Sequence, residues 1–367
     1  MIRQLAINQV FQSRLTDRWS VLAILRFALA SIVAINHLDA YVELGLLSFI
    51  HWFGAFEAIL GFLLISGYSV GTSYVMKPKG FFIRRLKRLL PIYIASIVLT
   101  VAINICILKE NLPSVLEIAL NLMFLNQLFT TTSYVGPAWS LSLEFWLYCI
   151  LPFLMLCSPR VLRAAVYMSF SGYLVYTCLR TLLHLPYYSH VGFGLNLLLL
   201  SFTWICGMRL ARGNEPSRLI MNDVGIVFAG HIILASTIQF LFRVKNSAVS
   251  QFFTDDLHKL FLPSLTLGAM YLIFHLISNS RVGVIKSPTR SVASVTAEIL
   301  GDISYPLYLI HIPVFMYLTS VGLQSAVLLY ASSVFASFTM YWFIDFYSRK
   351  RKTSSHGSVA GQTATRA

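Results

Sequence analysis

The chain has 367 residues, of which 57% are hydrophobic, 14% aromatic and only 11% charged, whereas soluble domains average about 25% charged residues. So few charges cannot cover the exterior of a soluble domain of this size. The composition excludes a soluble enzyme, a disordered chain and a secreted disulfide scaffold, and it predicts a polytopic membrane protein. The net charge of +14, from 28 Lys and Arg against 14 Asp and Glu, needs its own explanation.

The first twenty residues do not form a signal peptide, because Arg14, Asp17 and Arg18 precede any apolar run. They predict a short cytoplasmic arm that leads into a retained membrane helix. A spanning helix needs about 20 apolar residues, and the sequence contains ten such stretches. They are residues 20–41, 49–74, 89–108, 139–157, 162–182, 191–210, 220–242, 258–278, 294–318 and 322–346. The predicted fold is therefore all-α, with about ten transmembrane helices.

A shorter apolar stretch at residues 114–130 differs from these ten. It contains Glu117, Asn121, Asn126 and Gln127, which are costly to place in a bilayer. We expect an interfacial or re-entrant helix here, because a full crossing would swap the sides of every later loop.

Lys and Arg concentrate in cytoplasmic loops, so they set the predicted orientation. With both termini cytoplasmic, 23 of the 28 basic residues lie inside, and the exceptions are Lys109, Arg180, Arg243, Lys245 and Lys259. The expected organisation is one integral-membrane domain over residues 1–348 and a disordered cytoplasmic tail over residues 349–367. The five cysteines form no CxxC pair, and we expect neither a metal site nor a disulfide framework.

Ionisable residues inside membrane spans often mark function, and the first span carries two. Arg26 and His37 are eleven residues apart, which places them on one helix face and roughly 16 Å apart along the axis. Arg26 falls near the cytoplasmic end and His37 near the outer end. The alternative is a snorkelling arginine and an interfacial histidine without catalytic roles.

The loop after the second span is strongly basic, with Arg84, Arg85, Lys87 and Arg88 just before Pro91. Arg85 and Arg88 are about one helical turn apart and are suited to gripping phosphate groups. This pattern predicts a cytoplasmic site for a polyanion. An ordinary cytoplasmic anchor would have the same composition.

The segment 136–153 begins with Gly136-Pro137 and then enters the membrane from the outside. Glu144 lies roughly 8 Å deep by this count, where a carboxylate needs a partner. It is either a functional group or a structural partner for an arginine or tyrosine.

The segment 301–315 places Ser304, Tyr308 and His311 on one helix face. Pro306 and Pro313 predict a kinked helix, which in a membrane usually faces a cavity. His311 alone is equally typical of a packing histidine. Taken together, the four segments predict a cationic mouth at the cytoplasmic side and a cluster of histidine and carboxylate side chains near the outer side.

At this point the sequence resembles acyltransferase family 3, the bacterial multi-pass membrane O-acyltransferases, in the type that lacks an extracytoplasmic hydrolase-like domain. The matching segments occur in family order and cover most of the membrane part. They are LRFALASIVAINH (25–37), GFLLISGY (61–68), FFIRRLKRLLPIY (81–93), GPAWSLSLEFWLY (136–148) and ISYPLYLIHIPV (303–314). Phe27 departs from the glycine that the family often has after the helix 1 arginine.

The resemblance implies acyl transfer, most simply acetyl transfer, from cytoplasmic acyl-CoA to a hydroxyl of a saccharide or lipid-linked glycan at a bacterial inner membrane. No cofactor would be bound, and nucleic acid would not be a partner. Arg26, Arg85 and Arg88 would hold the donor, while His37 would act as general base. Glu144 would orient His37 or stabilise its imidazolium. Tyr308 and His311 would position the acceptor or stabilise the oxyanion. An acyl-histidine intermediate is an alternative route.

Two other classes of function fit the composition. A transporter or flippase for a glycan or small molecule also needs many helices and buried charges, but the sequence contains no inverted repeat. A sensor or assembly protein without catalysis leaves the buried His, Glu and Arg residues unexplained.

Overall fold

The computed structural model describes residues 2–107, 113–279 and 292–346, and every regular element in these ranges is helical. The tail predicted over residues 349–367 lies outside the described residues. Ten long helices occupy the ten predicted stretches. They are α1 (Ile2–Leu38), α3 (Ala55–Met76), α4 (Phe81–Cys106), α6 (Ala138–Leu154), α7 (Pro159–Leu183), α8 (Leu195–Arg212), α9 (Ser217–Lys245), α11 (Leu257–Asn279), α12 (Val292–Ser320) and α13 (Ala326–Met340).

Seven of the described helices are long and apolar enough to cross a membrane, namely those in α1, α3, α4, α9, α11, α12 and α13. Helix α6 is apolar but shorter. These helices make the chain a multi-pass membrane protein. The short elements are η1 (Gly45–Leu47), α2 (Ser48–His51), α5 (Val115–Leu122), η2 (Tyr188–His190), α10 (Val249–Gln251) and two π-helical segments, η3 (Phe252–Asp256) and η4 (Tyr341–Phe346).

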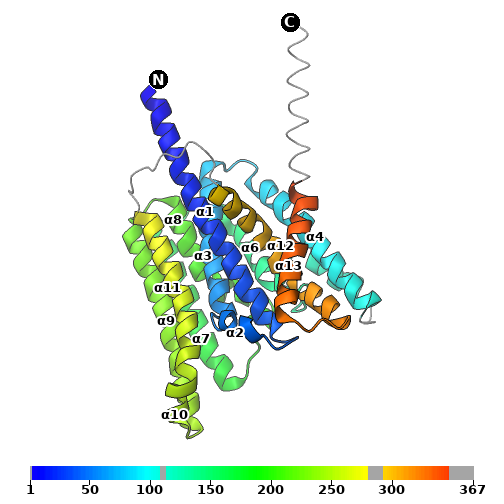
Figure 1. Ribbon diagram of the computed structural model, residues 1–367. Coiled ribbons are helices and arrows are strands. Elements are labelled where there is room, and N and C mark those ends of the chain that lie inside the picture. The colour runs from blue at the N-terminus through cyan, green and yellow to red at the C-terminus, as the bar shows by residue number, and fades with distance from the viewer. Residues whose placement is uncertain (1, 108–112, 280–291, 347–367) are drawn as a thin grey trace, which may run out of the picture.

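The beginning of the chain is helical and leads directly into the first candidate span, Arg18–Leu38. Helix α1 runs without a break from Ile2 to Leu38, so the first polar residues continue the membrane helix. At 1.5 Å per residue this helix is about 55 Å long, well beyond the roughly 30 Å of a bilayer core. Figure 1 shows α1 extending past the other helices at one end of the bundle.

Within the stretch 114–130, α5 spans only Val115–Leu122. Eight residues extend about 12 Å, too short to cross a bilayer. The Ser114 side chain accepts from the Glu117 backbone N–H, and the Glu117 carboxylate accepts from the Ser114 N–H, which forms a capping box. The Tyr134 hydroxyl also donates to Glu117 at 2.9 Å, and these hydrogen bonds lower the pKa of the Glu117 carboxyl.

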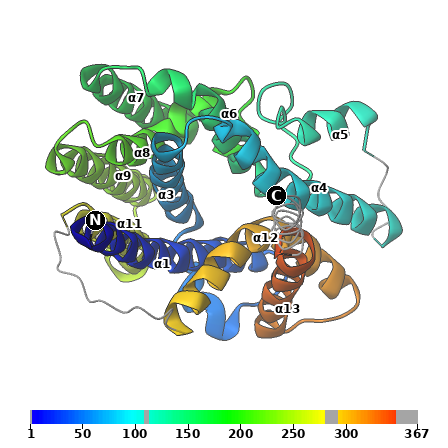
Figure 2. The ribbon, with the colours of Figure 1, turned by 90° about the horizontal axis from the view of Figure 1, so that it is seen from above.

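The helices form one bundle in which α3 packs mainly on α8, and α1 mainly on α12. Figure 2 shows α7, α8, α9 and α11 on one side of α3, with α4 and α5 extending away on the other. Helix α1 begins and η4 ends at the same end of the bundle (Figure 1). We call this the basic end, because α4 begins there with Arg84, Arg85, Lys87 and Arg88; α10 lies at the opposite end.

The close contact between α3 and α8 depends on two glycines. A Cβ added to Gly67 would lie 2.0 Å from the Trp204 carbonyl oxygen, and one added to Gly207 would lie 2.2 Å from the Leu64 carbonyl oxygen. Small residues let membrane helices approach backbone to backbone. This contact holds α3 in place, and α3 carries several residues of the site described below.

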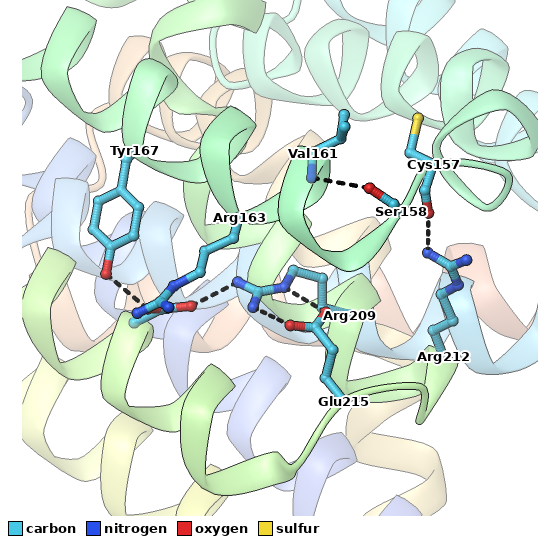
Figure 3. Close-up of polar contacts among 9 residues, drawn as sticks. Cys157, Ser158, Val161, Arg163, Tyr167, Arg209, Arg212 and Glu215 are labelled. Carbon is cyan, nitrogen blue, oxygen red and sulfur yellow. Dashed lines mark hydrogen bonds and ion pairs between the residues drawn. The ribbon is translucent and has the colours of Figure 1, made fainter.

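A buried ion network ties α7, α8 and α9 together at the basic end (Figure 3). Asp223 is fully buried and accepts from Arg209 Nη1 at 2.8 Å, Arg163 Nε at 3.1 Å and the Tyr167 hydroxyl at 2.7 Å. Arg209 also donates twice to Glu215, at 2.9 and 2.5 Å. Because every charge here has an opposite partner, the network fixes the three helices without leaving a buried charge uncompensated.

Candidate active site

A narrow cavity of about 120 Å³ lies between α1, α3, α4, α6 and α12. All three predicted donor-binding arginines line it, together with Glu144 and Tyr308. The other lining residues are Ile59, Phe62, Leu63, Ser66, Val70, Leu89, Ser140, Leu141, Tyr148, Gly301, Ser304 and Tyr305. The tertiary structure therefore brings five of the seven predicted site residues, from four helices, to one cavity.

The arginines converge at the basic end of this cavity. Arg26 donates to the Ser69 hydroxyl, and Arg85 Nη2 donates to the Ser69 carbonyl oxygen at 3.3 Å. Arg88 Nη2 lies 3.8 Å from an oxygen of Asp302. Ser69 thus draws two guanidinium groups from different helices to one point, which creates a strongly cationic mouth.

Glu144 lies in the same cavity and is the nearby carboxylate that balances part of this charge. It accepts hydrogen bonds from the Ser66 and Tyr148 hydroxyls. The Ser66 oxygen also accepts from Trp204 Nε1 at 3.3 Å. Glu144 is therefore held in a fixed orientation by α3 and by its own helix α6.

His37 and His311 form a direct pair at the other end of the site. His37 Nδ1 lies 2.9 Å from His311 Nε2, although the two residues are 274 positions apart in the sequence. The ring planes differ by only 13° and the centroids are 5.2 Å apart, so the rings meet edge to edge. His311 is completely buried, whereas His37 is half-buried.

The surrounding hydrogen bonds determine which nitrogens of the neutral pair carry protons. His311 Nδ1 lies 2.9 Å from the Leu307 carbonyl oxygen, which can only accept, so this nitrogen must be the donor. His311 Nε2 is then an acceptor, and His37 Nδ1 must donate to it. The remaining nitrogen, His37 Nε2, is then the unprotonated nitrogen of this ring.

Tyr308 connects the cavity to the histidine pair. Its hydroxyl is 2.7 Å from the Ser140 hydroxyl, and its ring packs edge-on against His311 with centroids 6.5 Å apart. Ser140 and Tyr308 both line the cavity. Tyr308 therefore links the cavity, which it lines, to the histidine pair, whose members are not among the lining residues.

The expectation that Glu144 orients His37 needs correction, because the group bonded to His37 is His311. The physical reason is the packing of α1 against α12, which places the two imidazoles in contact, while Glu144 turns toward α3. Sequence reasoning also missed Ser66 and Ser69, which hold Glu144, Arg26 and Arg85. Two serines inside the apolar segment GFLLISGYS were the available signal.

The described residues contain no group of three or more His, Cys, Asp or Glu side chains that could hold a metal ion. The cysteines are unpaired; Cys206 is buried, but Cys106 and Cys178 are exposed on the protein surface rather than packed in its interior. The chemistry on offer is thus that of imidazole, hydroxyl, carboxylate and guanidinium groups.

Two similarities to known proteins bear on the family of the chain. Over 272 residues, the chain is 23% identical to a protein of Acidianus two-tailed virus named "Putative acetyltransferase ORF330", with 71% of this chain and 72% of the viral protein covered. No solved structure matches the chain. Residues 20–345 match the family described as an acyltransferase domain. The chain therefore belongs to the membrane acyltransferase family 3 and is an O-acyltransferase.

Proposed function

We propose that this enzyme transfers an acetyl group from cytoplasmic acetyl-CoA to a hydroxyl of a saccharide or lipid-linked glycan. All ten long helices would cross the inner membrane of a bacterium, with the basic end and both termini on the cytoplasmic side. The observation that carries the proposal is that three arginines line one cavity together with Tyr308, which packs against the His37–His311 pair.

The donor end of the cavity has the chemistry that CoA requires. CoA carries several phosphate groups, and arginine side chains bind phosphates through charge-assisted, often bidentate hydrogen bonds. Arg26, Arg85 and Arg88 come from two helices and face one opening. With the phosphates held there, the narrow cavity suits the slender pantetheine arm, which would carry the thioester toward Tyr308 and the histidines.

The reaction needs a general base, and we assign this role to His37. His37 Nε2 takes the proton of the acceptor hydroxyl while the hydroxyl oxygen attacks the thioester carbonyl carbon. The C–S bond then breaks, the new ester C–O bond remains, and the CoA thiolate recovers the proton from His37. No acyl-enzyme is needed for this balance.

The neighbouring residues support the base and the developing charge. His311 Nε2 accepts a hydrogen bond from His37 Nδ1, which leaves the lone pair of His37 on Nε2. This hydrogen bond becomes stronger when His37 takes up a proton. Tyr308 is placed to donate a hydrogen bond to the oxyanion. Glu144 fixes Ser66 and limits the repulsion between Arg26 and Arg85.

The test combines purified enzyme with the producing cell. Enzyme in nanodiscs is incubated with acetyl-CoA labelled in the acetyl group and with surface polysaccharide from a strain that lacks the gene for this enzyme. We expect labelled ester on the polysaccharide with wild-type enzyme and none with His37→Ala, which should still bind acetyl-CoA. Mass spectrometry of surface glycans should show one acetyl ester lost in the deletion strain. Full activity of His37→Ala would rule out its role as base.

A further inference from the structure

A second and larger cavity, of about 490 Å³, opens toward the end of the bundle opposite the basic end. It lies between the first turn of α3, the second halves of α7 and α9, and the segment from η3 into α11. Its volume falls in the range of about 300–1,000 Å³ that is typical of small-molecule sites. None of the predicted catalytic or donor-binding residues lines it.

One wall of this cavity consists of aromatic rings. Phe56 stacks on Tyr188 with centroids 5.2 Å apart, and Tyr173 stacks on both, at 6.0 and 5.7 Å. Tyr187 packs edge-on against Phe56 and is 39% exposed. Tyr173 and Tyr188 are buried in this stack, so Tyr187 is the ring that can meet a ligand. Its face carries partial negative charge and therefore attracts the C–H groups on the face of a sugar ring.

The same cavity has an unusual concentration of positive charge. Only five of the 28 basic residues fall on this side of the predicted topology, and three of them, Arg180, Arg243 and Lys259, line this one cavity. Arg243 is neutralised by Asp256, through contacts of 2.6 and 2.9 Å. Arg180 and Lys259 have no such carboxylate partner among the described ion pairs.

Arg180 is also incompletely hydrogen-bonded. Its guanidinium lies over the rings of Tyr187 and Tyr188, at 5.4 and 5.7 Å from their centroids. Its Nε is buried and has no hydrogen-bond partner among the residues that the structure describes. A buried N–H of a charged group without a partner is costly, so this atom is suited to a ligand oxygen.

The floor of the cavity is a fixed polar network. His231 Nδ1 is 2.7 Å from the Tyr173 hydroxyl, and its Nε2 is 2.9 Å from a carboxylate oxygen of Glu57. These contacts join α3, α7 and α9, so the polar groups are held in position before any ligand arrives. Such preorganisation favours specific binding.

The two cavities are neighbours along α3. Phe56 lines the second cavity and Ile59 lines the first, and three residues of helix rise only about 4.5 Å. A molecule held in the second cavity therefore lies within about one helical turn of α3 from the first cavity.

We infer that the second cavity binds the acceptor, and that this acceptor is an acidic saccharide: a sugar ring stacks on the aromatic wall, and a carboxylate or phosphate group pairs with Arg180 and Lys259. This inference rests on the proposed transfer to a saccharide and deepens it. It separates the two substrates, with the donor phosphates held at the basic end and the anionic acceptor at the other.

The test is a binding measurement that requires no acyl transfer. Oligosaccharides released from the surface glycans of the producing cell are fluorescently labelled and separated by anion exchange into acidic and neutral fractions. Wild-type enzyme in nanodiscs should retain the acidic fraction. Because a charge-assisted hydrogen bond is at stake, Arg180→Gln should weaken retention by about tenfold to a hundredfold, and Arg180→Lys should keep most of it.

The aromatic wall is tested by Tyr187→Ala, which should weaken retention, whereas Tyr187→Phe should not. Tyr317→Ala is the matched control, because Tyr317 is similarly exposed, at 43%, and lines neither cavity. Loss of retention after phosphatase treatment of the acidic fraction would identify the anionic group as phosphate. Loss of retention after carboxyl reduction would identify it as carboxylate.

Several outcomes would overturn the inference: retention of the neutral fraction instead, no retention of either, or unchanged retention by Arg180→Gln and Tyr187→Ala. All these variants should bind acetyl-CoA like the wild type, and loss of donor binding in them would also count against a separate acceptor cavity. Retention of acidic oligosaccharides by an enzyme that does not bind acetyl-CoA would refute the proposed donor while leaving the cavity assignment standing.

Discussion

Replacing His311 gives the sharpest test of the catalytic arrangement, because His311 acts only through His37. Its Nδ1 donates to Leu307 and its Nε2 accepts from His37 at 2.9 Å. His311→Leu removes this acceptor but keeps an apolar side chain of similar size in a fully buried position. Gln places its amide oxygen the same number of bonds from the backbone as the histidine Nε2, so His311→Gln can restore the acceptor.

The magnitude follows from the change in charge during the reaction. A hydrogen bond between neutral groups contributes about 1 kcal/mol, and one to a charged group about 2 kcal/mol, so the bond to His311 strengthens by about 1 kcal/mol when His37 takes up a proton. That difference is worth about fivefold in rate. Without His311, roughly half of the His37 rings would also hold the proton on the wrong nitrogen. We therefore expect His311→Leu to lower kcat about tenfold.

The assay is transfer of labelled acetyl at saturating donor, with the KM for acetyl-CoA measured in parallel. His311→Leu should lower kcat and leave this KM near the wild-type value, because the arginines are untouched. His311→Gln should recover several-fold of the loss. A wild-type kcat for His311→Leu, or an equal loss in both variants, would refute the assignment of His311 as the residue that positions His37.

Three further predictions concern other parts of the molecule. Arg85→Ala with Arg88→Ala should raise the KM for acetyl-CoA about tenfold to a hundredfold with little change in kcat at saturation; the opposite pattern in steady-state kinetics would contradict donor binding. Asp223→Leu should lower the free energy of unfolding by about 3 kcal/mol, because Arg163 and the buried Arg209 each lose the carboxylate of Asp223. The measurement is an SDS titration, and the control is Asp39→Leu, at an exposed position. Hydrogen bonds from Arg243 and Gln239 hold the pKa of Asp256 well below its ordinary value. The ionised carboxylate therefore stabilises the fold above about pH 4, and this stabilisation is lost as the pH falls further. Thermal unfolding between about pH 5 and 3 should be less pH-dependent in Asp256→Asn, and equal slopes would show that the pair contributes nothing.

The sequence by itself was sufficient to locate the ten long helices. An apolar run of about 20 residues has few alternatives to a helix in a bilayer, because every backbone group must be satisfied within the segment. The same local reasoning predicted that residues 114–130 do not span, and α5 is indeed only eight residues long. Hydropathy alone did not indicate that the residues before the first span are helical, and α1 extends back to Ile2.

The sequence also singled out the residues of the site, because charges are scarce in the membrane segments and therefore conspicuous. Helix periodicity placed Arg26 and His37 on one face of α1, and Ser304, Tyr308 and His311 on one face of α12. It could not decide which faces meet. Depth predicted that Glu144 and the two histidines cluster near the outer side, but it could not decide which of them are in contact. The structure joins the two histidines, whereas Glu144 bonds Ser66 and Tyr148.

Tertiary packing made the decisive assignments. The contact between α1 and α12 joins His37 to His311 across 274 residues, and only this contact, with the bond to Leu307, determines which nitrogen is the base. Packing also gathers Arg180, Arg243 and Lys259 from three separate helices into one cavity, although in the sequence they were merely exceptions to the charge rule. Local composition determines which segments enter the membrane, whereas hydrogen bonds and ion pairs between distant segments exist only once the helices are packed.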